Sequence, residues 1–146
     1  RFEDILFEQL KAFPKTEAIL GAREAIEHLK IKGYSIAFAT GSLPKTAILK
    51  LQDAKIWFDE KILTTSKNSF SREGFVLEAI DKASKFYNVP FYESIISVGD
   101  GVWDLKTAQK LNLDFVGIGQ KNKAQLMNLG MEYWHENFKD FKIPNF

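Results

Sequence analysis

The sequence predicts a doubly wound α/β fold, in which helices cover both faces of a parallel sheet. Apolar segments with the helical period alternate along the chain with short, mostly apolar segments that suit buried strands. Glycines or polar turn residues separate the two kinds of segment, and the alternation repeats through most of the chain. At 146 residues and 45% hydrophobic content, the chain has the size of one domain with a substantial core.

The predicted elements follow one another in a regular order. Residues 2–13 predict a helix, because their apolar side chains recur on one helical stripe before Pro14. A second helix begins at Gly21 and ends at Gly33, and a strand over residues 34–39 follows it. Further helices are predicted at residues 44–54, 72–87, 103–111 and 121–129. Further strands are predicted at residues 61–65, 94–98 and 115–118.

The composition excludes several classes of function. Lys and Arg number 20 against 19 Asp and Glu, so the net charge of +1 gives no electrostatic footprint for nucleic acid or an anionic membrane. No apolar run approaches the roughly 20 residues that a membrane-spanning helix needs. The sequence has no cysteine, which excludes disulfides, thiolate zinc sites and cysteine nucleophiles and fits a cytoplasmic location. We therefore expect a cytoplasmic protein that acts on a small molecule.

Hydroxyl side chains follow the strand predicted at residues 34–39. In a parallel sheet of this kind, the ligand site lies beyond the carboxyl ends of the strands. Thr40, Gly41 and Ser42 stand there, immediately before a predicted helix. Hydroxyl donors and the backbone N–H groups of a helix start can hold a phosphate group. A purely structural alternative is that Thr40 ends the strand and Ser42 caps the helix.

Two carboxylates follow the strand predicted at residues 94–98. Asp100 lies between Gly99 and Gly101, and Asp104 comes four residues later at the start of a helix. Hard oxygen ligands at a strand end are what Mg²⁺ takes, while water and substrate oxygens fill its other positions. The pattern therefore predicts a metal site at Asp100 and Asp104. The structural alternative is that Asp104 caps its helix and Asp100 occupies a turn.

Arg72 is a third candidate, because it begins the long helix after the polar segment 66–71. A guanidinium at that position could hold a phosphate or steady a carboxylate. The structural alternative is an ordinary surface arginine.

Taken in order, these segments resemble the haloacid dehalogenase superfamily, and within it the small phosphatase-like hydrolases. Residues 36–42 resemble the second motif of that family, and residues 97–104 resemble the fourth. The resemblance implies a Rossmann-like core in which Thr40 holds a phosphate oxygen and Asp100 binds Mg²⁺. It also implies that Asp104 binds the metal or orients its water, and that Arg72 replaces the usual lysine of the third motif. The implied substrate is a small phosphorylated metabolite.

The first motif of the family, Asp-x-Asp after a strand, does not occur in this sequence. In the family, its first aspartate attacks phosphorus and its second acts as general acid and base. The resemblance therefore implies that residues 1–20 are the tail of a helical cap and residues 21–146 a core without its nucleophile strand. We expect residue 1 to be an internal position of a longer gene product. We expect the missing strand to come from upstream residues or another chain, and this chain alone to be inactive.

Two other functions fit parts of the sequence. The first is a non-catalytic domain that binds phosphate or a partner on the same scaffold. The second is a phosphoacceptor domain of the response-regulator type, which would need clustered acids after the strand at residues 34–39. Thr40, Gly41 and Ser42 do not supply them.

Overall fold

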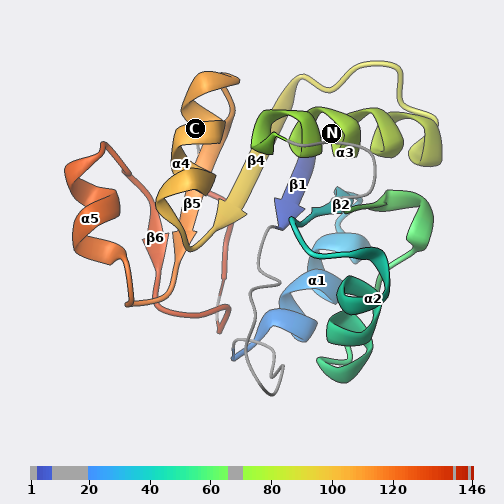
Figure 1. Ribbon diagram of the computed structural model, residues 1–146, viewed down its shortest axis with the longest axis horizontal. Coiled ribbons are helices and arrows are strands. Elements are labelled where there is room, and N and C mark those ends of the chain that lie inside the picture. The colour runs from blue at the N-terminus through green and yellow to red at the C-terminus, as the bar shows by residue number, and fades with distance from the viewer. Residues whose placement is uncertain (1–2, 8–19, 66–70, 140, 145) are drawn as a thin grey trace.

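The computed structural model describes residues 3–7, 20–65, 71–139, 141–144 and 146. In this part of the chain, six strands form one sheet in the order β3-β2-β1-β4-β5-β6, and every pair of neighbours is parallel (Figure 1). The strands are β1 (Glu3–Phe7), β2 (Ser35–Ala39), β3 (Leu63–Thr64), β4 (Ser94–Gly99), β5 (Asp114–Ile118) and β6 (Trp134–His135). The predicted α/β fold with a parallel sheet is confirmed.

The helices divide between the two faces of the sheet. They are α1 (Ala22–Ile31), α2 (Pro44–Asp53), α3 (Arg72–Tyr87), α4 (Val102–Lys110) and α5 (Lys123–Asn128), with a short 3₁₀ turn, η1 (Glu60–Ile62), before β3. Buried side chains of α1 and α2 belong to one core cluster, and those of α3 to another on the opposite face. Helices α3 and α4 contact one another. None of the described helices is long and apolar enough to cross a membrane.

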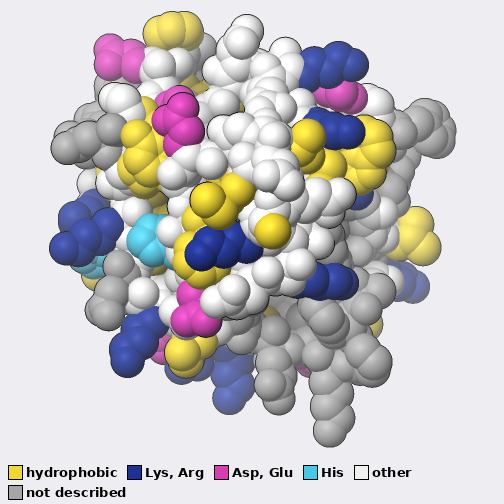
Figure 2. Space-filling model, turned by 90° about the vertical axis from the view of Figure 1, so that its left-hand side faces the viewer, with side chains coloured by type: hydrophobic (Ala, Val, Ile, Leu, Met, Phe, Trp, Pro, Cys, Tyr) yellow, Lys and Arg dark blue, Asp and Glu magenta, His cyan; other side chains and the backbone are white. Residues whose placement is uncertain are grey.

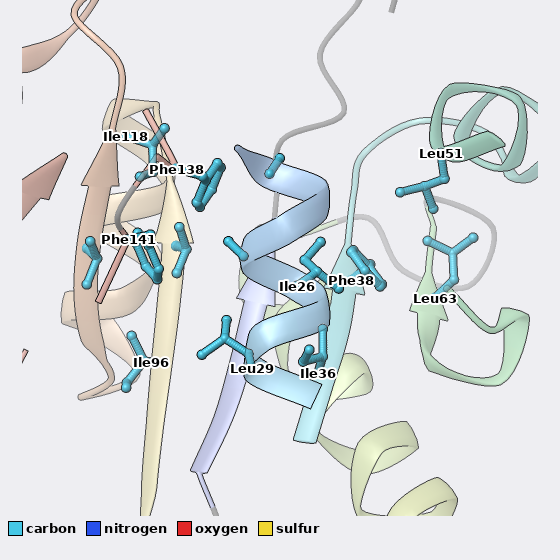
Figure 3. Close-up of a cluster of buried hydrophobic side chains, with 14 of the residues drawn as sticks. Ile26, Leu29, Ile36, Phe38, Leu51, Leu63, Ile96, Ile118, Phe138 and Phe141 are labelled. Atoms are coloured by element: carbon cyan, nitrogen blue, oxygen red, sulfur yellow. The ribbon is translucent and has the colours of Figure 1, made fainter. Parts of the chain in front are cut away.

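Strand β2 shows how one short segment supports both cores. All five of its residues are buried, as expected for a central strand of a parallel sheet. Ile36 and Phe38 face α1, where Ile26 and Leu29 pack against them in the cluster shown in Figure 3. Ala37 and Ala39, at alternate positions, belong to the core cluster on the α3 side. Small side chains on this face let α3 lie close to the sheet.

The central strand β1 corrects two of the expectations above. Residues 3–7 form a strand, not part of a helix, and they pair with β2 on one side and β4 on the other. The sheet therefore needs no central strand from upstream residues or another chain. The remaining residues assigned to a helical cap fall largely on 8–19, which lie outside the described residues. The helical spacing of apolar residues is a local pattern. Pairing with β2 and β4 outweighs it, because each buried backbone group left unpaired would cost about 1–3 kcal/mol.

Some boundaries differ from the prediction for local reasons. The strand expected at residues 61–65 is only Leu63–Thr64, because η1 occupies the preceding residues and the Asp59 carboxylate accepts a hydrogen bond from the Lys61 N–H at 2.8 Å. Strand β6 was not predicted. It is two residues long, and two residues are too few to show an alternating pattern.

Figure 2 shows the face formed largely by the carboxyl-terminal elements. Lysine and arginine side chains are interspersed there with acidic and apolar ones. No single-sign patch covers that face, which agrees with the balanced net charge.

Candidate functional site

The residues predicted for the site gather at the carboxyl ends of β2 and β4. Phe38 of β2 and Val98 of β4 both pair with Phe7 of the intervening β1. Thr40 and Asp100 therefore each lie two residues beyond the same level of the sheet. Two inter-strand spacings amount to roughly 10 Å, a distance that a phosphate group and a metal ion together can bridge.

The turn after β2 is held by the threonine predicted to bind phosphate. Thr40 is buried, its N–H donates to the Thr64 carbonyl at 3.0 Å, and its Oγ1 accepts from the Ser42 N–H at 3.1 Å. Gly41 is exposed between them. The N-cap of α2 is Leu43, and no side chain described in the structure caps that helix. Ser42 is therefore not the helix cap, and the structural alternative for it is wrong.

The turn after β4 is built around the carboxylate of Asp104. This side chain is 1% exposed, and its Oδ2 accepts from the N–H of Asp100 at 3.1 Å and from that of Gly101 at 2.8 Å. It is the third residue of α4, where the helix dipole favours negative charge. Asp104 does cap its helix, as the structural alternative proposed, and in doing so it shapes the turn that carries Asp100.

The glycine before Asp100 is required by the packing of this turn. A Cβ atom at Gly99 would lie 2.6 Å from both Cβ and Oδ2 of Asp104. Such an approach is too short for any side chain, so only glycine lets the Asp104 carboxylate reach the turn. The Asp100 carbonyl is fixed from another side, since Asn122 donates its Nδ2 hydrogen to it at 3.0 Å.

Arg72 connects the start of α3 to this turn. Its Nη1 lies 3.5 Å from Oδ1 of Asp104, and its side chain is half-buried. Ser71 caps α3, with Oγ accepting from the Gly74 N–H at 3.0 Å. A second link between the two helices joins Glu73 to Lys110 at 3.4 Å. The pKa of Glu73 is lowered by a backbone hydrogen bond and by the Lys110 ammonium.

One functional candidate, Lys50 of α2, was missed by the sequence reasoning. Lys50 is only 8% exposed, and its Nζ donates to Oγ of Ser42 at 3.3 Å. Its spacing gave a usable signal, because Ala47, Lys50 and Leu51 lie on the buried face of the same helix. A lysine on the apolar face of a helix is unusual enough to be a candidate.

The donor set of the β4 turn fits Mg²⁺. The metal is commonly held by one or two carboxylates together with water and substrate oxygens. Asp100 supplies such a carboxylate at the strand end, and its Oδ1 is buried. Both oxygens of Asp104 already accept hydrogen bonds from the protein. Within the described residues, no group of three or more His, Cys, Asp or Glu side chains could form a larger metal cluster.

These features define a doubly wound α/β domain whose candidate site residues lie at the carboxyl ends of the central strands. Residues 2–118 match the family of haloacid dehalogenase-like hydrolases, which is most of the chain. The protein therefore belongs to that family. No curated protein sequence matches the chain.

Several solved structures share the fold of this chain. A haloacid dehalogenase hydrolase of family IA, variant 3, from Entamoeba histolytica superimposes with a TM-score of 0.71 at 18% identity, over 87% of this chain and 58% of that one. A hydrolase from Pseudomonas syringae gives 0.69 at 22%, over 84% and 58%. A phosphoserine phosphohydrolase-like protein from Francisella tularensis gives 0.57 at 22%, over 82% and 59%. The chain thus spans less than two thirds of each of these proteins.

Proposed function

We propose that this chain provides the phosphate- and metal-binding part of a Mg²⁺-dependent phosphohydrolase that acts on a small phosphorylated metabolite. The observation that carries the proposal is the Asp104 carboxylate, which joins Arg72 to the turn bearing Asp100. The turn from Thr40 to Ser42, which carries two hydroxyl side chains, follows β2 and lies at the same level of the sheet as Asp100. Phosphoryl transfer depends mainly on positioning and on neutralising charge, and these groups are suited to both tasks.

Each residue has a distinct part in this proposal. The Thr40 hydroxyl, which accepts one hydrogen bond within its turn, directs its own hydrogen to a phosphate oxygen, and the backbone around Gly41 approaches the same group. Arg72 balances the negative charge of the phosphate. Asp100 would hold Mg²⁺, with Asp104 fixing its turn. The metal, when bound, would polarise a phosphoryl oxygen and neutralise developing charge.

The sequence does not contain the Asp-x-Asp motif that carries the nucleophile of the family reaction. Asp4 of β1 pairs with Ser35 and Ile95, near the amino ends of their strands and therefore at the opposite edge of the sheet. The reaction proposed for the complete enzyme, hydrolysis of a phosphomonoester through an aspartyl-phosphate, thus needs an aspartate from outside this chain. We infer that the 146-residue chain alone binds its ligands without turnover.

Calorimetric titration of the purified chain with Mg²⁺ tests the metal site. We expect binding to the wild-type chain and its loss in Asp100→Asn, because the neutral amide is a much poorer ligand for a hard cation. Asp53→Asn is the matched control, since Asp53 is exposed at the far end of α2. Equal Mg²⁺ affinity in all three proteins would refute the assignment of Asp100.

Hydrolysis of p-nitrophenyl phosphate, measured with and without Mg²⁺, tests the proposed need for an outside nucleophile. We expect no metal-dependent turnover by the chain alone. Turnover that survives extensive purification and disappears in Asp100→Asn would show that the nucleophile lies within the chain.

A non-catalytic phosphate-binding domain is the second candidate. It is favoured by β1, whose described residues fill the centre of the sheet without bringing an aspartate to its carboxyl edge. The two candidates share the binding behaviour of this chain and differ in the complete gene product. Phosphomonoesterase activity of that product would establish the enzyme.

A further inference from the structure

The buried lysine of α2 lies in surroundings where a lysine is costly. Lys50 shares the inward face of the helix with Ala47 and Leu51, and more than nine tenths of its surface is covered. Lysine is among the residues least often buried, because an ammonium group loses strong hydration when it leaves water. A methionine or leucine would fill the same face of the helix without that cost.

The ammonium of Lys50 is directed to the turn after β2. Its Nζ lies 3.3 Å from Oγ of Ser42, and the N–H of the same serine donates to Oγ1 of Thr40. A short chain of polar contacts therefore joins the buried cation to the residue proposed to bind phosphate. Arg72, on α3, is linked instead to Asp104 on the β4 side of the site.

We propose that Lys50 is a further anion-binding residue, whose ammonium group neutralises the phosphate held at the Thr40–Ser42 turn. This inference rests on the proposed function, because it assumes that the turn binds a phosphate. A lysine ammonium is a compact point charge with three donors, so one hydrogen can remain on Ser42 while another reaches a phosphate oxygen. Lys50 and Arg72 would then place positive charge on the β2 and β4 sides of the site.

Calorimetric titration of the purified chain with inorganic phosphate tests this inference. Lys50→Met keeps a side chain of similar length and removes the charge, and we expect it to weaken phosphate binding about tenfold or more. Lys50→Arg should restore most of the affinity because it restores the cation. Lys45→Met is the matched control on the same helix, since Lys45 is exposed, and it should bind phosphate as the wild type does.

Thr40→Val separates failure of this inference from failure of the proposed function. If Thr40→Val weakens phosphate binding while Lys50→Met matches the wild type, the role of Lys50 is refuted and the phosphate site stands. If the wild-type chain binds no phosphate, the phosphate site and the role of Lys50 fail together. Equal losses in Lys50→Met and Lys45→Met would show only a general charge effect and would also refute the inference.

A measurement on the wild-type chain covers the case in which Lys50→Met does not fold. With ¹³C-labelled lysine, the Lys50 side-chain resonance is identified as the one absent from the spectrum of Lys50→Arg. Phosphate should shift this resonance in a saturable manner and leave that of Lys45 in place. A Lys50 resonance that does not move while phosphate binds would overturn the inference.

Discussion

The phenol oxygen of Tyr87 donates a hydrogen bond to the carbonyl of Ile36 at 2.7 Å and accepts one from the N–H of the same residue at 3.0 Å. Strand β3 pairs with β2 only at Phe38 and Ala39, so its ladder stops short of Ile36. The last residue of α3 therefore satisfies the backbone groups that a longer β3 would have paired. One side chain thus completes the hydrogen bonding of β2 beyond the end of β3.

Tyr87→Phe removes this hydroxyl and little else. We expect the free energy of unfolding to fall by about 1–3 kcal/mol, because a buried N–H and carbonyl would lose their partner. Urea denaturation measures the change. Tyr133→Phe, which removes a hydroxyl from a half-buried ring packed on Phe146, serves as the control and should have a smaller effect. Equal changes in the two variants would contradict the role given to Tyr87.

Two glycines of the site should respond very differently to alanine. Gly99→Ala places a methyl group 2.6 Å from Asp104 and should lower the free energy of unfolding by about 2 kcal/mol or more, with loss of Mg²⁺ binding. At Gly41 the same methyl group would meet only a side-chain atom of Phe75, at 3.8 Å, an ordinary contact. Gly41→Ala should therefore keep its stability. Chemical denaturation compares the pair, and similar stabilities would show that the β4 turn can relax.

Asp104→Asn tests whether this carboxylate organises the β4 turn. An amide at this position keeps the shape but loses one of the two acceptor oxygens and the charge that faces Arg72. We expect a loss of about 2–4 kcal/mol of unfolding free energy together with weaker Mg²⁺ binding. Thermal and urea denaturation measure stability, and calorimetry measures the metal. Unchanged stability would mean that the turn forms without the carboxylate.

Arg72 should be replaceable in part by lysine and hardly at all by alanine. Lysine keeps the positive charge but not the planar donor arrangement, so Arg72→Lys should retain some affinity for inorganic phosphate. Arg72→Ala should lose most of it. Arg23→Ala is the control, because Arg23 is exposed on α1 and pairs there with Glu24 of the same helix. If Arg72→Ala and Arg23→Ala both bind phosphate as tightly as the wild type, Arg72 takes no part in anion binding.

The fold was predictable where local pattern and tertiary structure agree. The order of helices and strands from Gly21 to Ile118 followed from periodicity and turn residues, and the rule for strand ends placed Thr40 and Asp100 at one edge. Residues 3–7 form a strand, although the spacing of their apolar side chains is typical of a helix. Their structure is determined by pairing with two strands that are distant in the sequence. Such pairing is a non-local property that a short window of sequence does not contain.

The details of the site were less predictable than its position. The sequence indicated Asp104 as a metal ligand or as a cap, and only the three-dimensional contacts show that it reaches Arg72, 32 residues away along the chain. Lys50 was overlooked because lysine is ordinarily assigned to the surface. Its helical spacing with Ala47 and Leu51 was present in the sequence, but the packing was needed to show that the side chain is buried.

The carboxylate of Asp104 is shared between two structural units, since Oδ1 faces the guanidinium of α3 and Oδ2 binds the amides of the β4 turn. A ligand that draws Arg72 away from Oδ1 also changes the charge that holds the turn carrying Asp100. By thermodynamic reciprocity, a cation at Asp100 then changes the affinity at Arg72 by the same factor. Anion binding at Arg72 and cation binding at Asp100, as proposed here, would therefore be coupled equilibria, and the affinity of either ligand would have to be measured at a stated concentration of the other.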